Sequence, residues 1–261
     1  MRVALMQGPD GLAASGPAWD HLAASVQAVR PDILVTNEMP FGRWLAESEM
    51  FDAGAAAASV EAHGTGLGSL HDLGVPVVLS SRPVLAGDRL ANEAFALIQG
   101  AYRIAHHKHY FPVEAGFHET AWFRTERPGF DAVDAGPIKV GFMLCTELFF
   151  NEWARHYRRQ GAQLIAVPRA SGEGVEHWRT AAAMAAIVSG CYVVSSNRVG
   201  GASPEVTFGG KGFAFAPDGS LIVETSADEP VVVFDLDPGR SVEQQTQYPC
   251  YVQEIEAARA A

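Results

Sequence analysis

Short apolar runs rich in valine and isoleucine alternate along this chain with longer stretches in which apolar residues recur every three or four positions. Runs of four to eight apolar residues are typical of buried strands, and the longer spacing is typical of helices that cover a sheet. Such runs predict strands at Arg2–Gln7, Asp32–Thr36, Pro76–Ser80, Ile138–Leu144, Ala162–Val167 and Cys191–Ser196. The longer stretches predict helices at Pro17–Val29, Trp44–Leu73, Glu147–Gln160 and Glu176–Ser189. This alternation indicates an α/β fold with layered sheets.

Two further pairs of apolar runs are joined by short turn sequences and predict hairpins. Gln-Gly-Ala joins Glu93–Ile98 to Tyr102–His107, and Pro-Asp-Gly-Ser joins Gly212–Ala216 to Leu221–Glu224. Glycine, proline and aspartate at these positions favour the tight turns that hairpins need. No linker rich in proline, glycine and serine divides the sequence, and no internal repeat is visible. We therefore expect a single domain over residues 1–261.

Composition and charge narrow the possible classes of protein. The 261 residues are 48% hydrophobic and 19% charged, which excludes a disordered or fibrous chain. The net charge of −11 repels phosphate backbones and anionic lipids, so we expect neither a nucleic acid nor a membrane partner. Three cysteines are an odd number, which argues against a disulfide framework and for a reducing compartment. With a strand predicted from the first residues and no leader sequence, a cytoplasmic protein is expected.

Two motifs suggest cofactor or metal chemistry, but neither has the context it needs. Gly64–Gly68 resembles a dinucleotide-binding loop, yet it follows an alanine-rich helical stretch rather than a strand. His106, His107 and His109 form the one cluster with metal-ligand character, and on a strand His107 and His109 share a face. No second group with ligand spacing accompanies them, so hydrogen-bonded or exposed histidines are the preferred interpretation. Neither a cofactor nor a metal is predicted.

Cys145 is the candidate nucleophile. It follows the predicted strand Ile138–Leu144 and precedes a predicted helix, and such junctions lie at the edge of a sheet where α/β enzymes bind ligands. A helix N-terminus at this point would lower the pKa of the thiol and offer N–H groups to a developing oxyanion. The alternative is a buried core cysteine. Cys191 and Cys250 lack a comparable setting and are interpreted as structural.

Two charged residues could act with this thiol. Glu38 ends a predicted strand just before Pro40 and Gly42, a position suited to a general base, although a surface or helix-terminal glutamate is the alternative. Lys108 lies at the end of a predicted hairpin strand and is one of three lysines against sixteen arginines. Its compact ammonium group could hold an oxyanion, and a surface lysine is the alternative.

The order Glu38, Lys108, Cys145, with each residue at a strand end, resembles the nitrilase, or carbon-nitrogen hydrolase, superfamily over nearly the whole chain. Seven segments carry the resemblance in order and at similar spacing. They are the strand ending in Gln7, Asp32–Glu38 with Pro40, Tyr102–His109, Gly141–Glu147, Gly161–Pro168, Tyr192–Gly200, and Phe208–Gly210 with Pro217–Gly219.

The resemblance implies a four-layer αββα sandwich that pairs as a homodimer or a multiple of it, with no cofactor. It also implies a hydrolase in which Cys145 attacks the carbonyl of a small amide or N-carbamoyl compound and forms a thioester. Glu38 would be the base, and Lys108 would hold the oxyanion together with the N–H near Thr146. Family members carry a second glutamate that contacts the lysine. Glu119 is preferred to Glu114 for this role, because Phe123 and Pro128-Gly129 follow it in the family's order.

The sequence departs from the family pattern at three places, and these departures bear on the substrate. No proline follows Glu147, Ala185–Ser189 replaces an Arg-Ala-x-Glu-Asn pattern, and Arg169-Ala170-Ser171 follows Pro168. The substrate class is therefore open. Alternatives are nitrile hydrolysis by the same three residues, a catalytically silent binding or scaffold relative, and a metal-dependent hydrolase that uses the histidines. The candidates for substrate contact are Thr146, Glu147, Trp122 and Arg169.

Overall fold

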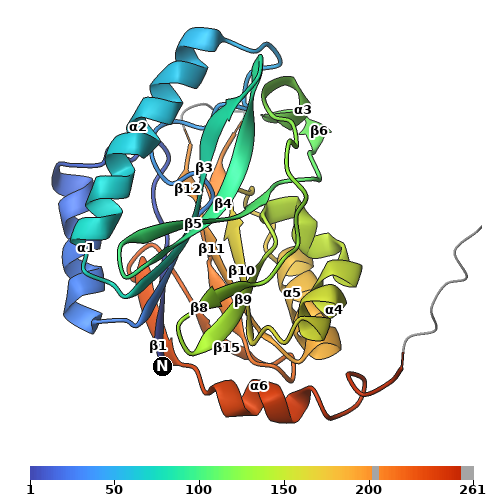
Figure 1. The fold of residues 1–261 in the computed structure, drawn as a ribbon. Helices are drawn as coiled ribbons and strands as arrows, with labels where there is room; N and C mark the ends of the chain where they lie inside the picture. Colours follow the sequence, from blue (N-terminus) through green and yellow to red (C-terminus); the bar gives the residue numbers. More distant parts are fainter. Residues whose placement is uncertain (202–205, 254–261) are drawn as a thin grey trace, which may run out of the picture.

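Two six-stranded sheets packed face to face form the centre of the protein (Figure 1). The computed structural model describes residues 1–201 and 206–253. The first sheet has the order β16 (Val231–Asp235), β1 (Arg2–Met6), β2 (Ile33–Thr36), β3 (Val77–Ala86), β4 (Arg89–Ile98), β5 (Ala101–His107). The second has the order β15 (Leu221–Glu224), β14 (Phe213–Phe215), β11 (Tyr192–Asn197), β10 (Leu164–Arg169), β9 (Ile138–Phe142), β8 (Val133–Ala135). Two short pairs join β12 (Val199–Gly200) to β13 (Phe208–Gly209) and β6 (Val113–Glu114) to β7 (Phe117–His118).

Helices α1 (Pro17–Val29) and α2 (Ala53–Asp72) cover the outer face of the first sheet, and α4 (Asn151–Arg159) and α5 (Glu176–Ser189) cover that of the second. The shorter helices are α3 (Glu119–Trp122), α6 (Pro238–Gln244) and a 3₁₀ helix, η1 (Cys145–Phe149). Along the central strands, alternate side chains such as Leu5 and Ala166 meet in the core between the sheets. Met6 faces the side that α1 and α2 cover, and Val167 faces α4 and α5. The layers are those of the predicted αββα sandwich.

Two predicted helices have different bounds in the structure. The helix expected at Trp44–Leu73 begins only at Ala53, because the Asp52 side chain caps it by accepting a hydrogen bond from the N–H of Ala55. Residues 44–52 form a loop instead. The helix expected at Glu147–Gln160 is divided, because Phe150 leaves the helical backbone region between η1 and α4.

A long hairpin and a bulge bring the lysine segment into place. The strand predicted at Pro76–Ser80 continues to the end of β3 and pairs with β4 along its whole length. Between β4 and β5 the register shifts at Ala94, opposite His106. Beyond the shift His106 pairs with Ala94 and His107 with Glu93, so the two histidines point to opposite faces of the sheet, and both are buried. Lys108 follows directly and is fully buried.

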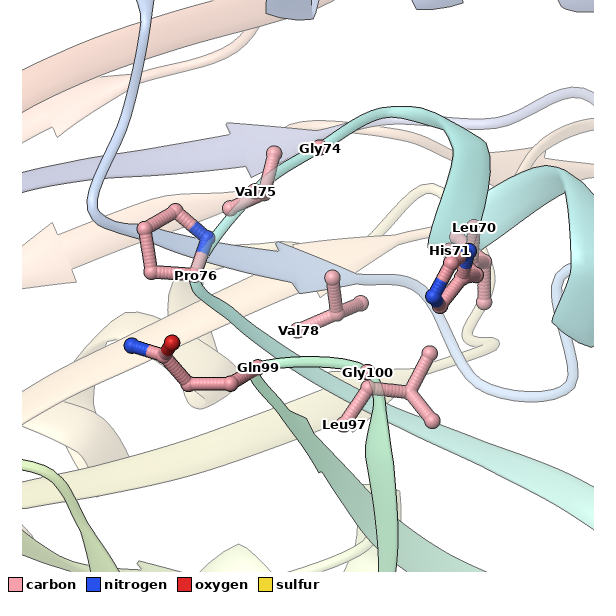
Figure 2. Close-up of a pocket in the computed structure, with 9 residues that line it drawn as sticks. All are labelled: Leu70, His71, Gly74, Val75, Pro76, Val78, Leu97, Gln99 and Gly100. Carbon is pink, nitrogen blue, oxygen red and sulfur yellow. The ribbon is translucent and has the colours of Figure 1, made fainter.

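A mainly apolar surface groove of about 320 Å³ lies between the end of α2 and the turn from β4 to β5 (Figure 2). His71 from α2 and Gln99 from the turn supply polar side chains there. The groove lies where β3 begins, whereas Glu38 follows the end of β2, which runs parallel to β3. It is therefore at the opposite end of the sheet from the candidate catalytic residues. Within residues 1–201 and 206–253, no helix has the length and apolar character needed to cross a membrane.

Candidate active site

Glu38 lies where β2 ends, between the two sheets. Its backbone N–H donates to the carbonyl of Arg169, 3.2 Å away at the end of β10, so the loop that carries Glu38 is tied to the second sheet. The Arg198 guanidinium also holds this loop, donating to the carbonyls of Glu38 and Met39. Arg198 forms an ion pair with Asp10 and is buried. Sequence reasoning used Arg198 only as part of a family motif and did not predict this contact.

The ammonium group of Lys108 joins two glutamates. Its Nζ lies 2.9 Å from Oε1 of Glu38, and 2.9 Å and 2.7 Å from Oε1 and Oε2 of Glu119, with all three side chains fully buried. Glu119 is the first residue of α3. Glu114, the alternative partner, is exposed on β6. The structure therefore brings Glu38, Lys108 and Glu119 into one hydrogen-bonded cluster.

Asn92 on β4 is a fourth member of this cluster that sequence reasoning missed. Its amide Nδ2 donates to Oε1 of Glu38 at 2.7 Å, and its backbone carbonyl accepts the N–H of Lys108 at 2.9 Å. The available signal was a pair of polar residues, Asn92 and Glu93, inside the otherwise apolar strand β4, because a buried polar group needs a specific partner.

Cys145 is the first residue of η1 and follows Leu144, shortly after the end of β9. Its backbone has φ of 49°, in the left-handed region, which costs a residue with a side chain about 1–2 kcal/mol. The side chain is 3% exposed, and Sγ donates to the carbonyl of Ala170 at 3.7 Å. The thiol thus sits at the carboxyl edge of the second sheet, held by the loop that follows β10.

Burial and charge set the protonation of the site. Burial, followed by the charge of Glu38, raises the pKa of the Cys145 thiol. The expectation that a helix N-terminus lowers this pKa was therefore wrong, because η1 is one short 3₁₀ segment and desolvation outweighs it. Burial by itself would lower the pKa of Lys108. The negative charges of Glu119 and Glu38 outweigh the effect of burial, so the pKa of Lys108 is raised. Burial raises the pKa of Glu119, and the charge of Lys108 opposes that shift and favours the ionised carboxylate.

Glu147, a candidate for substrate contact, is fully buried and uses both carboxylate oxygens inside the protein. Oε2 accepts the N–H of Leu144 at 2.7 Å, and Oε1 accepts the N–H of His109 at 2.7 Å. Nε2 of His106 lies 2.7 Å from Oε2. Glu147 therefore ties the turn that carries Cys145 to the segment around Lys108. Because its oxygens are occupied, its place in the structure is that of an internal clamp.

The histidines do not pair as strand alternation predicted. His106 and His109, with Glu147, place ligand atoms within 4.8 Å of one another, whereas Nε2 of His107 is 3.2 Å from Glu93. Both nitrogens of His106 are engaged, since Nδ1 accepts the N–H of Phe130 and Nε2 bonds Glu147. A metal ion at this cluster would have to replace these hydrogen bonds.

Arg169 and Trp122 are buried and bound to other parts of the chain. The guanidinium of Arg169 donates to Ser171 and to the carbonyl of Lys211, and it packs between aromatic rings of Trp178 and Phe213 in the core under α5. Burial lowers its pKa to about 10. The indole N–H of Trp122 donates to the carbonyl of Ser48. Thr146 differs from both, since its side chain is half-buried and follows Cys145 directly.

A family model described as Carbon-nitrogen hydrolase matches residues 18–245. The chain belongs to the carbon-nitrogen hydrolase family. The N-carbamoylputrescine amidase of Solanum tuberosum is 29% identical over 160 residues, covering 54% of this chain and 52% of that protein. The omega-amidase NIT2 of Homo sapiens is 25% identical over 134 residues, covering 50% and 49%. The chain thus spans about half the length of the curated relatives it matches.

Solved structures agree in fold. A carbon-nitrogen hydrolase from Helicobacter pylori G27 superposes with a TM-score of 0.82 at 22% identity, covering 96% of this chain and 94% of that chain. A variant of the amidase from Nesterenkonia sp. AN1 shows covalent addition of the acetamide moiety of fluoroacetamide at its active site cysteine, and it superposes with a TM-score of 0.72 at 21% identity, covering 93% of each chain. The match extends over both sheets of the sandwich.

Proposed function

We propose that this protein hydrolyses a non-peptide carbon-nitrogen bond in a small amide or N-carbamoyl compound through a thioester on Cys145. One observation carries the proposal: a fully buried Glu38–Lys108–Glu119 cluster whose charges act on the thiol of a cysteine at a sheet edge. Amide chemistry is also the activity in the names of the matched relatives, N-carbamoylputrescine amidase and omega-amidase. The closed cluster needs no cofactor or metal for this reaction.

The first step forms the thioester. The buried thiol is neutral at rest, so its proton must leave as the sulfur attacks, and Glu38 takes that proton. The sulfur bonds to the carbonyl carbon, and the carbonyl π electrons move onto oxygen. Lys108 and the backbone N–H at Thr146 stabilise this oxyanion. When the C–N bond breaks, Glu38 returns the proton to the departing ammonia or amine.

The second step uses the same groups with water. Glu38 takes a proton from a water molecule, whose oxygen attacks the thioester carbonyl, and the proton returns to the sulfur as the C–S bond breaks. Glu119 contacts only Lys108 within the cluster and serves to keep the ammonium charged and aimed at the oxyanion. Because Lys108 is fully buried, its charge depends on these two glutamates.

Two further features belong to the proposal. Thr146 contacts the substrate, since it is the half-buried side chain next to the nucleophile. Trp122 and Arg169 shape the walls behind the substrate from buried positions, and their effect on substrate choice can be tested separately.

We also propose that the protein forms a homodimer. Light scattering at micromolar concentration tests this proposal, and a monomer mass would contradict it.

Ammonia release from a panel of amides, N-carbamoyl compounds and nitriles tests the proposal. Cys145→Ala and Glu38→Gln should abolish release while both proteins still fold. Glu38→Gln should also lower the melting temperature, because buried Lys108 loses one of its two carboxylates. Cys191→Ala is the matched control, because Cys191 is equally buried but lies at the start of β11. Activity that survives both substitutions, or that a chelator removes and iodoacetamide does not, would contradict a cysteine mechanism. Preference for nitriles would favour nitrile hydrolysis by the same residues.

A further inference from the structure

We propose that Asn92 is a positioning residue that makes Oε2 of Glu38 the oxygen which takes and returns the proton. The inference rests on the proposed function, because it assigns a task within that reaction. It starts from the two oxygens of the Glu38 carboxylate, which differ in their surroundings. Oε1 accepts two hydrogen bonds, from Nδ2 of Asn92 at 2.7 Å and from Nζ of Lys108 at 2.9 Å.

The other oxygen of Glu38 is left available. Oε2 is buried, and within the described residues it has no hydrogen-bond partner. A buried carboxylate oxygen without a donor is costly unless a substrate, water or thiol proton uses it. The two donors on Oε1 fix the plane of the carboxylate and leave the oxygen at the other position without a donor. That position is therefore the one from which the carboxylate takes the proton in the reaction.

Asn92 also positions the backbone of Lys108. Its backbone carbonyl accepts the N–H of Lys108 at 2.9 Å, so one residue holds both Glu38 and Lys108. Asn92 lies within the β3–β4 hairpin, opposite Pro83, where paired strands restrain its backbone. Groups held on paired strands are placed more precisely than groups on loops.

The charges around Glu38 explain why a neutral donor serves here. Four titratable groups interact with the charge of Glu38. They are Lys108 after β5, Arg198 after β11, Glu119 on α3 and Cys145 on η1. An amide donor stabilises the Glu38 carboxylate without taking up a proton itself. Loss of that donor should leave the Glu38 carboxylate less firmly held, with Lys108 as the remaining donor to Oε1.

Asn92→Leu tests the donor separately from the shape, because leucine has a similar shape and donates no hydrogen bond. We expect kcat to fall about 10- to 100-fold with KM changed less than about threefold, as for loss of a positioning group. A loss in kcat that exceeds the change in KM separates a positioning role from a role in substrate binding. Asn92→Ser, whose hydroxyl is too short to reach Glu38, should behave alike and serves if Asn92→Leu does not fold.

Ser195→Ala is the matched control, since Ser195 is a fully buried polar residue on β11 whose hydroxyl donates to the carbonyl of Val167. It should lower the melting temperature without lowering kcat. The proposal is overturned if a folded Asn92 variant keeps wild-type kcat in an enzyme that Glu38→Gln inactivates. If Glu38→Gln and Cys145→Ala themselves keep full activity, the proposed function fails first, and the role of Asn92 falls with it.

Discussion

Replacing Glu119 by glutamine tests the buried lysine pair most directly. Both carboxylate oxygens of Glu119 lie within 2.9 Å of Nζ of Lys108, and neither side chain is exposed. Glutamine keeps the size of the side chain and one oxygen, but it removes the negative charge. The perturbation therefore acts on the charge and aim of the ammonium group rather than on packing.

The expected magnitude follows from the contact that is lost. A hydrogen bond to a charged group contributes about 1.5–3 kcal/mol. Each increase of about 1.36 kcal/mol in the activation free energy lowers the rate tenfold. We therefore expect kcat to fall by about 10²-fold. KM should change little, because orientation of Lys108 matters most when the oxyanion forms. Glu38 still neutralises Lys108, so the free energy of unfolding should fall by only about 1–3 kcal/mol.

The assay is steady-state ammonia release on the best amide of the panel, with urea unfolding of the same samples. Glu114→Gln is the matched control, since Glu114 is exposed on β6 and precedes Glu119 by only five positions. It should leave kcat within about twofold, as is usual for surface substitutions. A Glu119→Gln protein that folds normally and keeps kcat within threefold, or a larger effect from Glu114→Gln, would refute this account of the pair.

Four further outcomes are expected. Limiting iodoacetamide should inactivate in step with labelling of Cys145, measured by mass spectrometry; activity that instead falls with labelling of Cys191 would misplace the nucleophile. Glu147→Gln should lower both kcat and the free energy of unfolding, the latter by about 1–3 kcal/mol, because two buried N–H groups lose a charged acceptor; equal urea midpoints would contradict the clamp. His63 is buried, and burial lowers its pKa to about 4. Its contribution to the free energy of unfolding is therefore present above about pH 6.5 and is lost as pH falls toward 4, with about 2–3 kcal/mol lost at pH 4.5. In His63→Gln the dependence of the free energy of unfolding on pH should be flatter over this range. Arg169→Ala should change the ratio of kcat/KM for anionic against neutral amides; a lower melting temperature with an unchanged ratio would leave Arg169 a structural role alone.

The sequence by itself determined the strands, most helices and the set of residues worth testing. Apolar runs are local signals, since a buried strand must be apolar wherever it lies in the sheet, so the central strands were predicted closely. Glu38, Lys108 and Cys145 could be singled out because each follows such a run at a strand end. Glu119 was chosen over Glu114 from family order, and the structure places Glu119 against Lys108.

Only the tertiary structure decided how these residues act on one another. Asn92 and Glu38 are 54 positions apart, and Arg198 reaches Glu38 from 160 positions away, so no local pattern could join them. Glu147 looked like a substrate contact from its place after Cys145, yet folding encloses it and supplies both oxygens with donors. The direction of the Cys145 pKa shift was also mispredicted, because desolvation depends on everything packed around the thiol. Periodicity records which side chains are buried, but the partners that they meet depend on how distant strands and loops come together.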